Sequence, residues 1–183
     1  MDKYIDIKLL PDPEFDEQQL MNALFSKLHR GIGAAAPSKI GVSFPSYGKR
    51  LGNHLRIHGA LADITKLMQQ TWLQGMKDYC QISEVSHVPD DVKYRTVKRI
   101  QAKSAHNKRE RSIRKGWLTP EEALERIPES QQKKLKQPFI QMKSLSNKNP
   151  MRVYIEHGSL RDTPSDGTFN AYGLSSEATI PWF

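Results

Sequence analysis

The sequence contains one cysteine, Cys80, in 183 residues. A single cysteine excludes an internal disulfide framework, a paired-cysteine redox centre and a zinc site built from cysteines, and it is typical of proteins in a reducing compartment. No run of about 18 apolar residues occurs, and the first ten residues carry charges in place of an apolar signal segment. We therefore expect a cytoplasmic protein without a membrane span.

Acidic residues are nearly absent from one stretch of the chain. The sequence has 28 Lys or Arg against 20 Asp or Glu, a net charge of +8. Residues 93–115 hold ten of the basic residues and only one acid, Glu110, so the rest of the chain has 18 basic and 19 acidic residues. Such a concentrated charge is the footprint of a phosphate-binding surface, with a solvated charged helix as the alternative. The sequence thus predicts a nucleic-acid partner.

The apolar pattern of residues 1–90 predicts a first domain. Period-two alternation predicts strands at 4–9, 40–44, 55–58 and around 80–82, and helical spacing predicts helices at 16–30, ending at Gly31, and at 61–68. This βαββαβ order is that of the ferredoxin-like fold, a four-stranded sheet with two helices. Because the strand His54–His58 has no aromatic residue, we do not expect the sheet to bind RNA as an RNA-recognition motif does.

Residues 91–183 form a smaller predicted domain, also α+β, that carries a basic helix near 104–115. Ser104 is a suitable N-cap and Gly116 a suitable stop for this helix. A second helix is predicted at 120–127, because Thr119 and Glu122 match a capping box. Strands are predicted at 139–145 and 151–156, followed by the segments 169–174 and 180–183.

Candidates for chemistry are few. The six histidines form no HExxH pattern, His54 and His58 would stand about 13 Å apart on a strand, and the acids form no compact cluster. We expect neither a metal ion nor a cofactor. RNA can be cut without metal if a base removes the proton of its 2′-hydroxyl, and His29, at the end of the first helix, is the best-placed histidine. The alternative is a helix-end histidine stabilised by the helix dipole.

Several stretches, in order, resemble one protein family. They are Met1–Ile7 with Pro11–Phe15, Lys27–His29, Ile40–Pro45, Tyr94–Ser104, Ser144–Ser146, Ala171–Ser175 and the final Pro181–Phe183. The chain resembles the CRISPR-associated endoribonuclease of type I-F systems, which processes precursor CRISPR RNA. The resemblance spans almost the whole chain.

The resemblance implies a function and three catalytic residues. Members bind a repeat RNA hairpin with an arginine-rich helix, cut at the 3′ base of its stem without metal, and remain bound within a surveillance complex. By this resemblance His29 is the general base, Ser144 holds the attacking ribose hydroxyl and Tyr172 positions His29. For Ser144 the alternative is a strand-end hydroxyl bonded to backbone, and for Tyr172 a packed loop aromatic. We expect a monomer when the chain is alone.

The RNA-binding prediction rests on the basic segment. Arg99 and Gln101 lie two residues apart on an extended approach, where Arg suits guanine and Gln suits adenine. Lys108, Arg111 and Lys115 share one helical face. The full predicted set is Arg99, Gln101, Lys103, Ser104, Lys108, Arg109, Arg111, Arg114, Lys115, Ser146 and Met151.

The chain departs from the family's pattern in two places. Glu110, Ser112 and Gly116 interrupt the arginine-rich helix, and Met151 replaces an aromatic expected to stack on the terminal base pair. Two other functions stay open from the sequence. One is a non-catalytic RNA-binding subunit of a larger complex, and the other is a basic DNA-binding domain.

Overall fold

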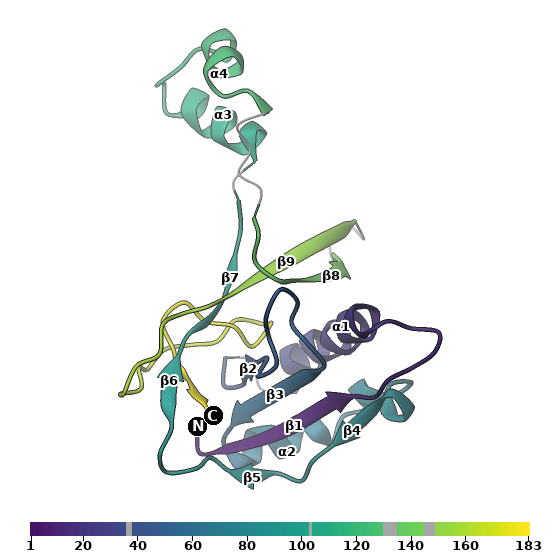
Figure 1. Ribbon diagram of the computed structural model, residues 1–183. Coiled ribbons are helices and arrows are strands. Elements are labelled where there is room, and N and C mark those ends of the chain that lie inside the picture. Colours follow the sequence, from purple (N-terminus) through teal and green to yellow (C-terminus); the bar gives the residue numbers. More distant parts are fainter. Residues whose placement is uncertain (36–37, 103, 130–134, 145–148) are drawn as a thin grey trace. The chain divides into compact units, whose positions relative to one another are not determined.

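The computed structural model describes residues 1–35, 38–102, 104–129, 135–144 and 149–183 (Figure 1). The chain forms two compact units. The first joins Met1–Arg99 with Gln137–Phe183, and the second is Ile100–Lys136, inserted between them. The predicted boundary at residue 90 falls within the first unit, because β10 (Ile180–Trp182) pairs with β6 (Lys93–Arg95) there. The division into functional domains stays a prediction.

An antiparallel sheet forms the centre of the first unit. Its strands are β1 (Lys3–Leu9), β2 (Gly41–Ser43), β3 (His54–Gly59) and β4 (Cys80–Ile82), in the order β2-β3-β1-β4, with β5 (Ser86–His87) also beside β1. The helices are α1 (Glu17–Ala35) and α2 (Leu61–Met68), followed by the 3₁₀ turns η1 (Thr71–Leu73) and η2 (Lys77–Tyr79). The predicted order of strands and helices is confirmed along the chain, and the fold is mixed α/β with antiparallel sheets.

Helix α1 extends further than the sequence predicts. It was expected to end at Gly31, yet it continues to Ala35. A Cβ atom at Gly31 would stand 3.1 Å from Trp72 Cγ and 3.2 Å from Leu67 Cδ1, closer than most Cβ contacts. Gly31 is therefore a residue of close packing within the helix, and the prediction of a helix stop and a loop from that residue was wrong.

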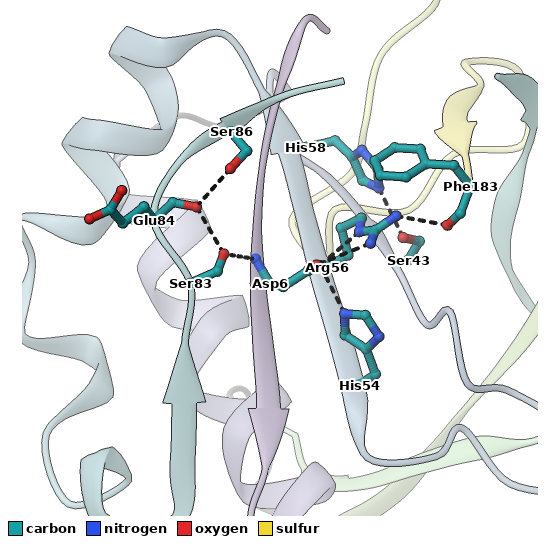
Figure 2. Close-up of polar contacts among 9 residues, drawn as sticks. All are labelled: Asp6, Ser43, His54, Arg56, His58, Ser83, Glu84, Ser86 and Phe183. Atoms are coloured by element: carbon teal, nitrogen blue, oxygen red, sulfur yellow. Dashed lines mark hydrogen bonds and ion pairs between the residues drawn. The ribbon is translucent and has the colours of Figure 1, made fainter. Parts of the chain in front are cut away.

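The sheet face that carries Arg56 is packed against the C-terminal segment. Asp6 accepts hydrogen bonds from Arg56 Nε at 2.7 Å and Nη2 at 3.0 Å, and Arg56 Nη1 donates to the Phe183 backbone oxygen at 2.8 Å. The guanidinium carbon also lies 3.9 Å from the centroid of the Phe183 ring. Figure 2 shows Arg56 between Asp6 and Phe183, with His54 beside the same carboxylate. This face of β3 is thus covered by protein.

A second sheet of the first unit lies against α1. It contains β7 (Val97–Ile100), β9 (Pro150–His157) and β8 (Phe139–Lys143), in that order. Gln18 Nε2 donates to the Phe139 backbone oxygen at 3.0 Å, and Asn22 Oδ1 accepts from the Gln141 backbone nitrogen at 2.8 Å. These two bonds join β8 to α1. The predicted strand at 151–156 is confirmed, and the one predicted at 139–145 is confirmed as far as Lys143, where β8 ends.

The second unit contains α3 (Ala105–Arg114) and α4 (Pro120–Arg126). Ser104 Oγ accepts from the Asn107 backbone nitrogen at 3.1 Å, and Thr119 and Glu122 form a reciprocal capping box. Gly116, with φ of 67°, follows the end of α3, because glycine adopts this left-handed conformation without strain. Both predicted helices and their caps are confirmed. Among the residues described, none of the helices is long and apolar enough to cross a membrane.

Candidate active site and nucleic-acid interface

His29 and Tyr172 form a stacked pair in the first unit. Their ring centroids lie 4.2 Å apart with an interplanar angle of 13°. Phe25, one helical turn before His29 on α1, is nearly parallel to the Tyr172 ring at a centroid distance of 6.3 Å. Tyr172 thus lies along the face of α1 that carries Phe25 and His29, so two predicted catalytic residues are in contact.

A hydrogen bond fixes the orientation of the His29 ring. His29 Nδ1 lies 2.7 Å from the backbone oxygen of Ala171. Because a carbonyl oxygen only accepts, Nδ1 carries the proton of this bond. In the neutral ring, Nε2 is then the unprotonated nitrogen and the basic atom.

The segment that holds Tyr172 is fixed by backbone hydrogen bonds. Asn170 Oδ1 accepts from the backbone nitrogens of Tyr172 at 2.9 Å and Leu174 at 3.2 Å, as in an Asx turn. Val42 of β2 donates its backbone N–H to the Gly173 oxygen at 2.8 Å. Gly173 has a φ of 70°, and a Cβ there would stand 2.4 Å from Val42 Cγ2. Only glycine fits this turn, which carries Tyr172.

Arg99 lies over the Tyr172 ring. Its guanidinium carbon is 5.3 Å from the ring centroid, within the range of a cation–π contact. Arg99 Nε is buried, and within the described part of the chain it has no hydrogen-bond partner. The predicted base-reading arginine therefore belongs to the same cluster as His29 and Tyr172, whereas the side chain of Gln101 is exposed.

Ser144 follows the last residue of β8. Its backbone N–H donates to the Asn149 oxygen at 2.9 Å. The bonds from Phe139 to Gln18 and from Gln141 to Asn22 show that β8 and α1 run alongside each other in the same direction. Ser144 is three strand residues beyond Gln141, and His29 is seven helical residues beyond Asn22, so each lies about 10 Å further along. This register predicts that Ser144 and His29 lie at the same level.

Three other residues were predicted to bind RNA, and the structure describes one of them, Met151. Met151 lies opposite Met142 in the β8–β9 pair and packs, half-buried, against the apolar core. Its side chain is on the same side of β9 as Val153 and Ile155, which are both buried. Lys103 and Ser146 lie outside the described residues.

Helix α3 carries most of the predicted phosphate contacts. Arg111, Arg114 and Lys115 are exposed and Lys108 is half-buried. Arg109 differs, because its side chain is only 13% exposed and its Nη1 donates to the Ile127 backbone oxygen at 2.9 Å. Arg109 thus binds the residue that ends α4, and Ser104 caps α3. Both of these predicted RNA-binding side chains are engaged within the second unit.

Comparison with known proteins gives the family. A family model described as "CRISPR-associated protein (Cas_Csy4)" matches residues 4–183. The chain belongs to this family. The chain is 46% identical over 184 residues to "CRISPR-associated endonuclease Cas6/Csy4" of Escherichia coli (strain UTI89 / UPEC), with 100% of both chains covered. It is 43% identical over 187 residues to the protein of the same name from Pseudomonas aeruginosa (strain UCBPP-PA14), again with 100% of both chains covered. The resemblance read from the sequence is confirmed.

Two other histidines of this Cas_Csy4 family member, His58 and His157, are largely buried and contact neighbouring side chains. Complete burial, with a further contribution from Arg56, lowers the pKa of His58 to about 3, and its Nε2 is 2.9 Å from Ser43 Oγ. Burial and the nearby Arg95 lower the pKa of His157 to about 4, and its ring stacks on Tyr47. In the ranges that the structure describes, no group of three His, Cys, Asp or Glu could hold a metal ion.

The sequence analysis did not single out Trp117, an aromatic residue that follows the basic helix α3. Lys115 Nζ lies 4.6 Å from the centroid of the Trp117 ring, and Trp117 is 62% exposed. A large aromatic residue directly after a basic helix is a signal for nucleobase or cation contact. The order Lys115, Gly116, Trp117 carries that signal in the sequence.

Proposed function

We propose that this protein is a metal-independent endoribonuclease that binds a CRISPR repeat hairpin and cuts it at the 3′ base of the stem. One observation carries the proposal. His29 is stacked on Tyr172 and donates from Nδ1 to the Ala171 backbone oxygen, an arrangement that leaves Nε2 as the nitrogen that can accept a proton. The name of the two relatives, CRISPR-associated endonuclease, supports the same chemistry.

The proposed reaction needs only side chains of the first unit. His29 Nε2 takes the proton of the 2′-hydroxyl, and the 2′-oxygen attacks the adjacent phosphorus. The bond from phosphorus to the 5′-oxygen breaks, that oxygen takes a proton from water to become a 5′-hydroxyl, and His29 returns its own proton to the solvent. The other product end is a cyclic phosphate, which hydrolysis opens to a 3′ phosphate. Ser144 holds the attacking ribose hydroxyl, an orientation effect, and Tyr172 keeps the imidazole ring in place.

The proposed RNA contacts come from both units. Arg99 and Gln101 read bases of the stem, and the exposed cations of α3 contact phosphates. The interrupted arginine pattern leaves Arg111, Arg114 and Lys115 as the exposed cations of this helix and its C-cap. A half-buried Met151 offers a thioether in place of an aromatic ring to the end of the stem.

Two further proposals accompany this function. We infer that residues 1–90 have the ferredoxin-like arrangement, which the antiparallel order β2-β3-β1-β4 and the helices α1 and α2 support. We also propose that the protein stays on its product in the cytoplasm, together with other subunits of a type I-F surveillance complex. A protein that holds the hairpin of its RNA product with a basic helix can remain on that product while other subunits bind the rest of the RNA.

The decisive experiment uses the repeat RNA of the CRISPR array in the same genome. With the wild-type protein, chelator should leave cleavage unchanged, and a single 2′-deoxy substitution at the cut nucleotide should abolish cleavage but leave binding intact. A 2′-deoxy substitution at the next nucleotide in the 5′ direction is the matched control and should be cut normally. Cleavage of the first deoxy RNA would overturn the mechanism. A wild-type protein that binds the all-ribose hairpin without cutting it would support the binding-subunit alternative.

A further inference from the structure

A cleft of about 300 Å³ lies beside α1, on a part of the first unit that the proposed reaction does not use. It is lined by Lys27, Arg30, Thr71, Trp72 and Gln74. Lys27 and Arg30 stand on either side of His29 in the sequence of α1. The cleft therefore lies beside the part of α1 that carries His29, the proposed general base.

The two cations of the cleft are hydrogen-bonded to backbone oxygens and not to carboxylates of the described residues. Lys27 Nζ donates to the Gln74 backbone oxygen at 2.7 Å, and Arg30 Nε donates to the Ser26 backbone oxygen at 3.2 Å. Both acceptors are neutral carbonyls, and neither cation takes part in an ion pair of the described residues. Among the described residues that line the cleft, none carries a carboxylate. Two oriented positive charges without a counter-ion attract an anion.

Trp72 forms the wall of the cleft next to α1. The residue is 9% exposed, and its Nε1–H is buried without a hydrogen-bond partner in the part of the chain that the structure describes. A buried donor without an acceptor costs stability, so such groups usually have a partner. Gly31 allows the indole to approach α1 closely, with Trp72 Cγ 3.1 Å from the position a Cβ would take.

We propose that this cleft binds backbone phosphates of the single-stranded RNA that flanks the hairpin stem. The inference rests on the proposed function, which brings the stem base to His29. Strands that leave the stem on its 5′ and 3′ sides both start at that base, and their phosphates are the anions linked to the cut site. A cleft of about 300 Å³ accommodates a piece of one strand and not a duplex.

The test measures the affinity of the full-length protein for three repeat RNAs across a range of salt concentrations. One RNA is the hairpin alone, one adds the 5′ flank, and one adds the 3′ flank with a 2′-deoxy cut nucleotide. One flanked RNA should bind about tenfold tighter than the bare hairpin, as for one charge-assisted hydrogen bond. Its salt slope should be steeper by about 1.4, for two phosphates on a single strand. The arm that shows the gain identifies the strand.

Variants of the cleft residues test whether the higher affinity for the flanked RNA comes from the cleft. Lys27→Ala with Arg30→Ala should remove the flank's gain and the extra salt slope while leaving affinity for the bare hairpin unchanged. Lys27→Gln with Arg30→Gln keeps polar side chains in place and should give the same loss. Lys8→Ala with Lys39→Ala removes two exposed lysines that are outside the cleft lining, and should keep the flank's gain.

The outcomes separate the two proposals. Flanks that add no affinity, or variants that weaken binding of all three RNAs equally, would overturn the cleft assignment while the proposed nuclease function stands. A wild-type protein that binds none of the hairpins would instead overturn the proposed function itself.

Discussion

Phe25, Leu28 and Phe44 are completely buried in the first unit, whereas the apolar residues buried in the described part of the second unit are Ala105 and Ala123. The first unit is thus stabilised by a large apolar core, as ordinary domains are. The second unit depends on helix caps and on the bond from Arg109 to the end of α4. Helices that bury so little need a further partner for stability, and RNA phosphates would provide one.

The largest expected effect separates chemistry from binding. His29→Ala should lower the rate of repeat cleavage by about 10²- to 10⁴-fold, because the general base is lost. Affinity for the hairpin should stay within about twofold, since the predicted phosphate contacts lie on α3 and Arg99 contacts the ring of Tyr172, which the substitution keeps. Single-turnover cleavage and a filter-binding titration measure the two quantities. His106→Ala is the control, because His106 is exposed on α3. Equal loss of binding and cleavage would contradict the separation.

The next effect concerns the basic helix. Replacing Lys108, Arg111 and Lys115 together by Ala should weaken RNA binding and reduce its salt slope by about 2 to 3, because three phosphate contacts are lost. Cleavage at saturating protein should be nearly unchanged, since the catalytic residues are intact. The control replaces Lys39, Lys66 and Lys77, three exposed lysines of the first unit, by Ala. An unchanged salt slope for the α3 variant would show that α3 does not contact phosphates.

A smaller effect should appear on acidification. Unfolded histidines have a pKa near 6.5, whereas the folded values are lowered to about 3 for His58 and about 4 for His157. The unfolded chain therefore binds protons first, so this stability is complete above pH 6.5 and falls as the pH drops through 6.5 towards 4. At pH 5 the loss is up to about 2 kcal/mol per histidine.

Thermal unfolding at pH 7.5 and pH 5 measures this loss. His157→Phe should reduce the difference in Tm between the two conditions, and His106→Gln, in the second unit, should not. A Tm difference that is the same for wild type and His157→Phe would contradict the assignment to this buried group.

The smallest effect tests the cap of α3. Ser104→Ala should destabilise the helix by about 1 kcal/mol, because the bond to Asn107 is lost. Ser104→Asp keeps an N-cap acceptor, so the helical signal in circular dichroism should return. If Ser104 also contacts RNA, the added negative charge of Ser104→Asp weakens hairpin binding. Equal hairpin binding by Ser104→Asp and wild type would assign Ser104 to the cap alone.

Local signals account for the elements that the sequence predicted well. The alternation of polar and apolar residues predicted β1, the Ser104 cap predicted α3, and the capping box at Thr119 predicted α4. Each of these signals is complete within a few residues. Gly31 was misread since the reason for it, Trp72, is remote in sequence. In the sequence, a glycine that ends a helix looks the same as a glycine that packs inside one. The two can be told apart only when the residue that packs against the glycine is known.

The candidate site could not be assembled from periodicity. The oxygen that orients His29 belongs to Ala171, 142 residues later. The contact between Arg99 and Tyr172 likewise joins distant segments, so a residue predicted from charge to read bases also lies in the cluster with the proposed base. Only the family resemblance brought His29, Ser144 and Tyr172 together in advance, and the position of Ser144 at the cut stays a prediction.

The insertion of the second unit has a consequence for how recognition can change during evolution. Residues Ile100–Lys136 leave the first unit after β7 and return before β8, two strands of one small sheet. Their buried apolar contribution is limited to small side chains in the described part of the chain. If this segment contacts the repeat hairpin as proposed, substitutions in it can change the RNA that is bound at little cost to the first unit, which orients His29.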